Sequence, residues 1–162
     1  MIEMKKVFGF IMLAGLMFLT SCDLTKKYEQ KEKESIMNYL NNHPELTFTL
    51  RESGLYYMDV IIGDGEKPLA GDTVFVHYEG FYLDNYKFTS NMDDDPYVFP
   101  AGKGYAIPGF DEGILLIKEG GSAKMLIPSY LGYGNSGYMI PAYTPLLFNV
   151  RLDSIVPGIR NN

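Results

Sequence analysis

Short segments in which polar and apolar residues alternate, separated by glycine, proline and aspartate, cover most of the chain. In residues 73–82, Val74, Val76 and Tyr78 alternate with more polar residues, which is the period of a β-strand with one buried face. Residues 146–155 repeat this alternation at the end of the chain. These patterns predict a protein built mainly of β-sheet.

Other segments predict further strands and a single helix inside the domain. Short strands are expected over residues 47–50, 55–62, 86–90, 97–99 and 122–127. Between residues 108 and 118 the period changes, because Phe110, Ile114 and Ile117 recur at helical spacing. The sequence therefore predicts an α+β fold, in which a mostly antiparallel sheet packs against one short α-helix.

The composition indicates one globular domain and excludes several classes of function. The chain has 162 residues, of which 46% are hydrophobic and 21% charged, as is usual for a protein that folds into a single domain. Its formal net charge of -6 offers no basic surface for nucleic acid. One cysteine and two histidines are too few soft ligands for a structural zinc site, and no glycine-rich nucleotide loop is present. We expect no nucleic-acid partner, no metal and no cofactor.

The start of the chain has the pattern of an export signal with a lipid attachment site. Two lysines precede an apolar run over residues 7–20, which is too short to span a bilayer. The run ends in the letters LTSC, which resemble the lipobox of bacterial lipoproteins, and Cys22 is the only cysteine of the chain. An ordinary secretory cleavage site is the alternative. We predict a lipoprotein signal peptide over residues 1–21 and a lipid on Cys22. The lipid would anchor the protein in the cell envelope, on the periplasmic or outer-membrane side.

The segment after the signal is predicted to be a charged helical tether over residues 22–45. Residues 23–42 are rich in lysine and glutamate and contain neither glycine nor proline. Three apolar residues recur at helical spacing near the end of this segment: Ile36, Met37 and Leu40. We expect this apolar face to dock on the domain, and binding of a partner is the alternative.

Some residues that could carry chemistry are expected to have structural roles instead. Neither His43 nor His77 has an evident serine or cysteine partner, so neither forms a catalytic dyad. The run Asp93-Asp94-Asp95 lacks the glycine and distal glutamate of a calcium loop and is predicted to be a solvated acidic loop. What remains is a set of aromatic residues, with 13 Tyr and 10 Phe but no Trp.

Five motifs follow one another in a fixed order along the domain. They are VHYEG at 76–80, KFTS at 87–90, AIPGFDEG at 106–113, YLGYG at 130–134, and IP at 140–141 with LFNVRL at 147–152. Together they resemble the FKBP-type peptidyl-prolyl cis-trans isomerases, and the resemblance extends over about residues 54–156. It implies a domain over residues 46–158, in which a curved antiparallel sheet wraps around the short helix. It also implies a pocket between them that binds proline-containing peptides and macrolide inhibitors.

The resemblance assigns residues of this sequence to the pocket. Those assigned to catalysis are Tyr78, Phe88, Ile107, Phe110, Tyr133 and Phe148. Those assigned to substrate binding are Tyr97, Phe99, Ile140 and Thr89. In this assignment Phe110 stands where the family usually has tryptophan, the backbone N–H of Ile107 binds a substrate carbonyl, and the Tyr133 hydroxyl is a second donor.

Prolyl isomerisation needs neither a nucleophile nor a metal. The barrier of about 18–20 kcal/mol comes from loss of amide resonance, and the twisted amide is less polar than the planar one. A dry aromatic pocket with a few oriented donors therefore favours the twisted state. One position departs from the family pattern, because Thr89 stands where an acidic residue normally follows the phenylalanine. Loss of a charged hydrogen bond costs roughly 1.5–3 kcal/mol, so we expect reduced rather than abolished activity.

The sequence thus favours a lipid-anchored prolyl isomerase that acts on Xaa-Pro bonds of exported or unfolded proteins. A weakly active or inactive binding module of the same fold, which captures proline-containing segments as a chaperone does, is the first alternative. A structural subunit of an envelope complex, assembled through the apolar face of the tether, is the second. Catalysed exchange of a short Xaa-Pro peptide distinguishes the enzyme from both.

Overall fold

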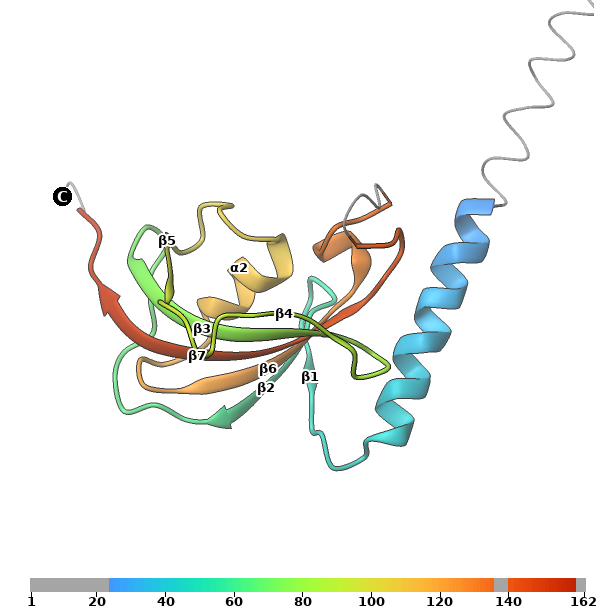
Figure 1. Cartoon of the computed structure of the whole chain (residues 1–162), viewed down its shortest axis with the longest axis horizontal. Helices are drawn as coiled ribbons and strands as arrows, with labels where there is room; N and C mark the ends of the chain where they lie inside the picture. Colours follow the sequence, from blue (N-terminus) through green and yellow to red (C-terminus); the bar gives the residue numbers. More distant parts are fainter. Residues whose placement is uncertain (1–23, 136–139, 160–162) are drawn as a thin grey trace, which may run out of the picture.

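A computed structural model describes residues 24–135 and 140–159 of the chain (Figure 1). The predicted signal peptide and Cys22 lie outside the described residues. Within the described ranges, no helix has both the length and the apolar character needed to cross a membrane.

The domain is built on one antiparallel sheet of seven strands. The strands are β1 (Thr49–Leu50), β2 (Tyr56–Ile61), β3 (Thr73–Tyr82), β4 (Lys87–Ser90), β5 (Tyr97–Pro100), β6 (Ser122–Ile127) and β7 (Leu146–Val156). Their order across the sheet is β1-β2-β6-β7-β3-β4, and β5 pairs with the same edge of β3 as β4 does. The predicted α+β fold is confirmed.

The alternation of residues along the strands divides the sheet into two faces. On β3, Val74 and Val76 are buried in the main core, and on β7 Phe148 and Val150 are buried there too. The pairing of β3 with β7 shifts register between Phe75 and Val76, which is a β-bulge. Bulges increase strand bending and twist, and Figure 1 shows the long strands curving around the helix of the domain.

Helix α2 (Pro108–Ile114) packs on the concave face of the sheet. Pro108 begins the helix, where a missing N–H costs nothing, and Phe110 and Ile114 are buried. The helix is shorter than the prediction of 108–118, because the chain continues in tight turns after Ile114. Ile117 is nevertheless fully buried, so its helical spacing from Phe110 and Ile114 indicated burial and not the length of the helix. A single 3₁₀ turn, η1 (Ser129–Leu131), follows β6 and was not predicted.

The N-terminal helix, residues 24–42, packs against the face of the sheet opposite α2. Ile36 is buried against Leu126 and Leu147, which point away from the main core, and Leu40 is partly buried beside them. The predicted docking of the tether is confirmed for these two residues. It is wrong for Met37, which remains 52% exposed because the apolar stripe of the helix continues through Tyr39 instead.

Candidate active site

A pocket of about 600 Å³ lies between α2 and the concave face of the sheet. It is lined by Tyr78, Phe88, Thr89, Tyr97, Gly104, Tyr105, Ala106, Ile107, Phe110, Tyr133, Ile140 and Phe148. All six residues assigned to catalysis by resemblance meet here, together with three of the four assigned to substrate binding. The fold therefore brings together side chains from β3, β4, β5, β7, α2 and two loops.

Aromatic rings form the floor and walls of the pocket. Phe110 is only 4% exposed, and its ring centroid lies 5.3 Å from that of Phe148 and 5.5 Å from that of Tyr78. Both pairs are close to perpendicular, at interplanar angles of 77° and 76°, which is a favourable arrangement for aromatic rings. The rings support one another, so the floor has a fixed shape.

Phe99 is the assigned residue that does not line the pocket. It is 3% exposed, and its ring stacks on Tyr97 with centroids 4.6 Å apart. Residues two apart on a strand share one face, so the alternation predicts that Tyr97 and Phe99 both lie on the inner side of β5. It does not predict which of the two side chains is more deeply buried. Phe99 supports the wall that Tyr97 forms.

The backbone N–H of Ile107 is a hydrogen-bond donor at the rim. Ile107 is the residue before α2, with φ −58° and ψ 145°, the extended conformation that a following proline favours. Its carbonyl accepts hydrogen bonds from the N–H groups of Phe110 and Asp111. None of the residues in 24–135 and 140–159 accepts a hydrogen bond from the Ile107 N–H. This N–H is therefore an oriented donor that the pocket offers to a ligand.

Asp111 fixes the loop that precedes α2, a role that the sequence did not indicate. Its carboxylate is buried and accepts hydrogen bonds from the N–H groups of Gly102 and Gly104, both at 2.8 Å. The same loop places Tyr105 and Ala106 in the pocket lining. An acidic residue in the first turn of a helix is common, so its position alone gives no sign of this contact.

Gly80 is the second residue with an unpredicted role. A Cβ at this position would lie 2.7 Å from Cζ of Phe88, 2.8 Å from Cε1 of Phe148 and 2.8 Å from Cγ2 of Thr89. These distances are shorter than van der Waals contact, so two pocket walls meet over β3 because residue 80 has no side chain.

The described pocket lining carries no charged side chain, and the hydroxyls of Tyr97 and Tyr133 keep their protons. Burial, and next the neighbouring Tyr78, raise the pKa of both Tyr97 and Tyr133 above the ordinary value near 10. The Tyr97 hydroxyl donates to the carbonyl of Tyr105 at 3.0 Å. None of the described lining residues carries a carboxylate, and among the described residues no cluster of His, Cys, Asp or Glu could hold a metal ion.

Comparison with known proteins identifies the family. The family model described as FKBP-type peptidyl-prolyl cis-trans isomerase matches residues 64–153. FKBP-type peptidyl-prolyl cis-trans isomerase FkpA of Aeromonas hydrophila is 43% identical over 106 residues, which are 64% of this chain and 39% of that protein. FK506-binding protein of Neisseria meningitidis serogroup B is 39% identical over 102 residues, 61% of this chain and 94% of that protein.

A solved structure agrees with these sequence matches. The crystal structure of FkpA from Escherichia coli superposes with a TM-score of 0.72 at 31% identity, and covers 86% of this chain and 65% of that chain. This chain therefore matches only part of the length of the FkpA proteins. The sheet wrapped around α2, the aromatic pocket and the family match over more than half of the sequence lead to one conclusion: the chain belongs to the family of FKBP-type peptidyl-prolyl cis-trans isomerases.

Proposed function

We propose that this protein is a peptidyl-prolyl cis-trans isomerase that acts on Xaa-Pro bonds of exported or unfolded polypeptides. The observation that carries the proposal is an uncharged aromatic pocket with the Ile107 N–H at its rim. The relatives named as isomerases support it.

In the proposed mechanism the pocket binds the twisted amide better than the planar one. Phe110, Phe148 and Tyr78 surround the proline ring and exclude water from the rotating bond. Because the twisted amide is less polar, an apolar site destabilises it less than it destabilises the planar ground state. The Ile107 N–H and the Tyr133 hydroxyl donate hydrogen bonds to substrate carbonyls and hold the chain on either side of the rotating bond.

Thr89 lowers the rate that we expect from this site. It lines the pocket near Tyr78, and no hydrogen bond joins the two side chains in the described structure. A neutral hydroxyl cannot supply the negative charge that the family resemblance assigns to this position. We therefore propose an active enzyme whose kcat/KM is lower than that of relatives with an acidic residue here.

We further propose that the protein is exported and held on a membrane by a lipid on Cys22. The support is in the sequence, where a short apolar run ends in LTSC with the only cysteine of the chain. The chain then divides into a signal peptide at 1–21, a helical tether at 22–45 and the isomerase domain at 46–158. The name of the Neisseria relative, FK506-binding protein, supports a pocket that also takes macrolide inhibitors.

NMR exchange spectroscopy on a short Xaa-Pro peptide tests the proposed activity without a coupled protease. We expect the protein to accelerate exchange between the cis and trans proline signals, and Phe110→Ala to reduce this acceleration by at least about tenfold. A protein that binds the peptide but leaves the exchange rate unchanged would instead be a binding module of the same fold. Asp93→Asn, in an exposed loop outside the pocket, is the matched control.

A further inference from the structure

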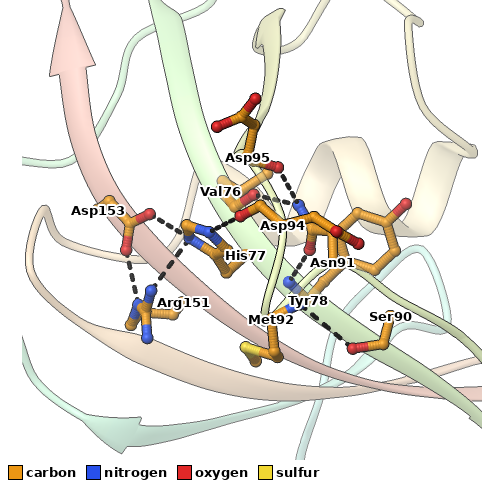
Figure 2. Close-up of polar contacts among 10 residues, drawn as sticks. All are labelled: Val76, His77, Tyr78, Ser90, Asn91, Met92, Asp94, Asp95, Arg151 and Asp153. Atoms are coloured by element: carbon orange, nitrogen blue, oxygen red, sulfur yellow. Dashed lines mark hydrogen bonds and ion pairs between the residues drawn. The ribbon is translucent and has the colours of Figure 1, made fainter.

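The hydrogen-bond ladder along one edge of β3 is interrupted beside the pocket. β5 pairs with residues 73–76 and β4 pairs with residues 79–81, so His77 and Tyr78 lie between the two strands. Asn91, in the loop that joins β4 to β5, fills this gap (Figure 2). Its Oδ1 accepts the Tyr78 N–H at 2.7 Å, its Nδ2 donates to the Val76 carbonyl at 3.1 Å, and its own N–H donates to the Tyr78 carbonyl at 3.1 Å.

His77 attaches the same loop from its other side. The residue is 9% exposed, and its Nε2 lies 3.1 Å from the carbonyl oxygen of Asp94. Its Nδ1 lies 2.5 Å from Oδ2 of Asp153 and 3.0 Å from Nη2 of Arg151. Asp153 also accepts a hydrogen bond from Nε of Arg151 at 2.6 Å, and Figure 2 shows the three side chains in one group.

These two attachments place the pocket walls on either side of Tyr78. The loop connects β4, which carries Phe88 and Thr89, to β5, which carries Tyr97. In the described part of the chain, the other hydrogen bonds of this loop stay within it or reach only the end of β4. The acidic residues at 93–95 are exposed to solvent. The position of the loop therefore depends on Asn91 and His77.

The surroundings of His77 allow its ring to change charge without releasing the loop. A carbonyl oxygen only accepts hydrogen bonds, so Nε2 must carry a proton to bind Asp94. Nδ1 faces both an acceptor, Asp153, and a donor, Arg151, so it has a partner with or without its proton. The remaining charged groups nearby are the exposed carboxylates at 93–95 and Glu79, which is paired with Lys87.

We propose that Asn91 and His77 are positioning residues of the pocket, and that Arg151 keeps the His77 attachment closed in both charge states of the imidazole. The inference rests on the proposed isomerase function, because it concerns the same pocket. It assigns a role in activity to residues that do not touch the substrate.

Substitutions of the two attachment residues test the first half of the proposal. We expect Asn91→Ala and His77→Leu each to lower kcat/KM by about fivefold to tenfold, measured well below the melting temperature, because small displacements of pocket groups have large kinetic effects. His77→Gln retains an amide donor at the place of Nε2 and should restore kcat/KM to within about twofold of the parent. Asp93→Asn is the control. Parental kcat/KM in the folded Asn91→Ala and His77→Leu proteins would overturn the proposal.

A pH profile tests the role of Arg151 with a change at a half-exposed side chain. Between about pH 5.5 and 9 the parent should show nearly constant kcat/KM, because Nδ1 of His77 faces both an acceptor, Asp153, and a donor, Arg151. In Arg151→Met no donor faces Nδ1, so we expect the neutral ring to keep its proton on Nδ1, where it is donated to the Asp153 carboxylate. Nε2 then has no proton to donate to the Asp94 carbonyl, and this hydrogen bond is lost. We then expect kcat/KM to fall about fivefold as the pH rises, and to recover on reacidification. Arg51→Met, on the loop after β1, controls for loss of a positive charge.

Peptide affinity, measured on the same proteins, separates this inference from the proposed function. One outcome is that the peptide binds the parent with constant affinity but binds Arg151→Met more weakly as the pH rises. This outcome supports the proposed attachment of the loop by His77, even if exchange is not catalysed. Only the isomerase proposal then fails. Catalysis by the parent together with a flat profile in Arg151→Met would overturn the attachment and leave the isomerase proposal intact. A parent whose kcat/KM falls as the pH rises from about 5.5 to 9 would overturn it as well.

Discussion

Gly80 occupies a point on β3 where the rings of Phe88 and Phe148 both approach the backbone closely. A methyl group there cannot be accommodated without moving both rings, since each lies less than 3 Å from its position. We predict that Gly80→Ala lowers kcat/KM by at least about tenfold, because both pocket walls are displaced. Overpacking should also cost about 1–3 kcal/mol of folding free energy, which a melting curve measures. A folded variant with parental kinetics would contradict this role.

Thr89 is the residue at which a substitution should increase activity. If stabilisation of the twisted amide limits the rate, the carboxylate in Thr89→Asp should raise kcat/KM by up to about tenfold, or roughly 1.4 kcal/mol. Peptide affinity should change much less, because the aromatic walls bind ground state and transition state alike.

Thr89→Asn is the matched control for Thr89→Asp, because it has nearly the same shape but no charge. A melting curve is needed for both, since a carboxylate beside apolar rings has a desolvation cost. Equal rates in the folded Thr89→Asp and Thr89→Asn variants would show that the missing charge does not limit the proposed activity.

The pocket residues could be predicted because their neighbours in sequence form recognisable motifs. Phe110 and Ile107 lie in one continuous motif, and the structure places both in the pocket lining. The supporting residues could not be predicted in this way. The contact of Asp111 with two loop N–H groups, and the absence of space at Gly80, depend on how separate segments meet in the fold.

At the scale of elements, the N-terminal helix and η1 are joined by one buried carboxylate. Glu32 is 8% exposed, and its two oxygens accept hydrogen bonds from the N–H of Ser129 at 2.5 Å and from its hydroxyl at 2.7 Å. Ser129 is the first residue of η1, so Glu32 satisfies a backbone donor that the short helix leaves free. The next turn of the N-terminal helix adds the apolar contact of Ile36.

We predict that Glu32→Gln weakens the docking of this helix by about 1.5–3 kcal/mol, because one charged acceptor is replaced by an amide group whose NH₂ faces a donor. The substitution should therefore accelerate hydrogen exchange of the helix amides in 24–42 relative to the parent. Exchange of the amides in the strands of the sheet should be accelerated less. Glu34→Gln, at an exposed position of the same helix, is the control.

Ser129→Ala removes one of the two donors to Glu32 and completes a double-mutant cycle. If the two groups interact directly, the effects of Glu32→Gln and Ser129→Ala on helix exchange should be less than additive. Fully additive effects, or unchanged exchange in Glu32→Gln, would contradict this docking contact.

Elements with one buried face were predictable, and their ends were not. β3 and β7 alternate because one side faces α2, so their side-chain pattern is visible in the sequence. The end of α2 is set by turns whose hydrogen bonds leave no such pattern, and Ile117 remained buried after the helix had ended. Met37 was assigned to the docking face by spacing alone, whereas the position of the sheet decides which residues the helix covers.

At the scale of the whole molecule, the proposed location depends on Cys22, which lies outside the described residues. We predict that Cys22→Ser no longer incorporates labelled fatty acid, because the sulfur is the proposed attachment atom. Its domain should melt at the parental temperature, because the buried residues of both hydrophobic clusters lie between residues 36 and 152. Ser21→Ala keeps the sulfur and should retain the label. Incorporation of fatty acid into Cys22→Ser would refute the lipid anchor.

The position of β7 in the sheet determines when the domain is able to fold. The last strand of the sequence lies in the middle of the sheet, between β6 and β3. Before residues 146–156 are available, the sheet consists of two fragments with open edges. One fragment contains β3, β4 and β5, and the other contains β1, β2 and β6. The floor of the pocket then lacks Phe148. Because these central pairings join residues far apart in sequence, their formation is slow compared with local structure. Folding of this domain must therefore wait until residues 146–156 have been synthesised.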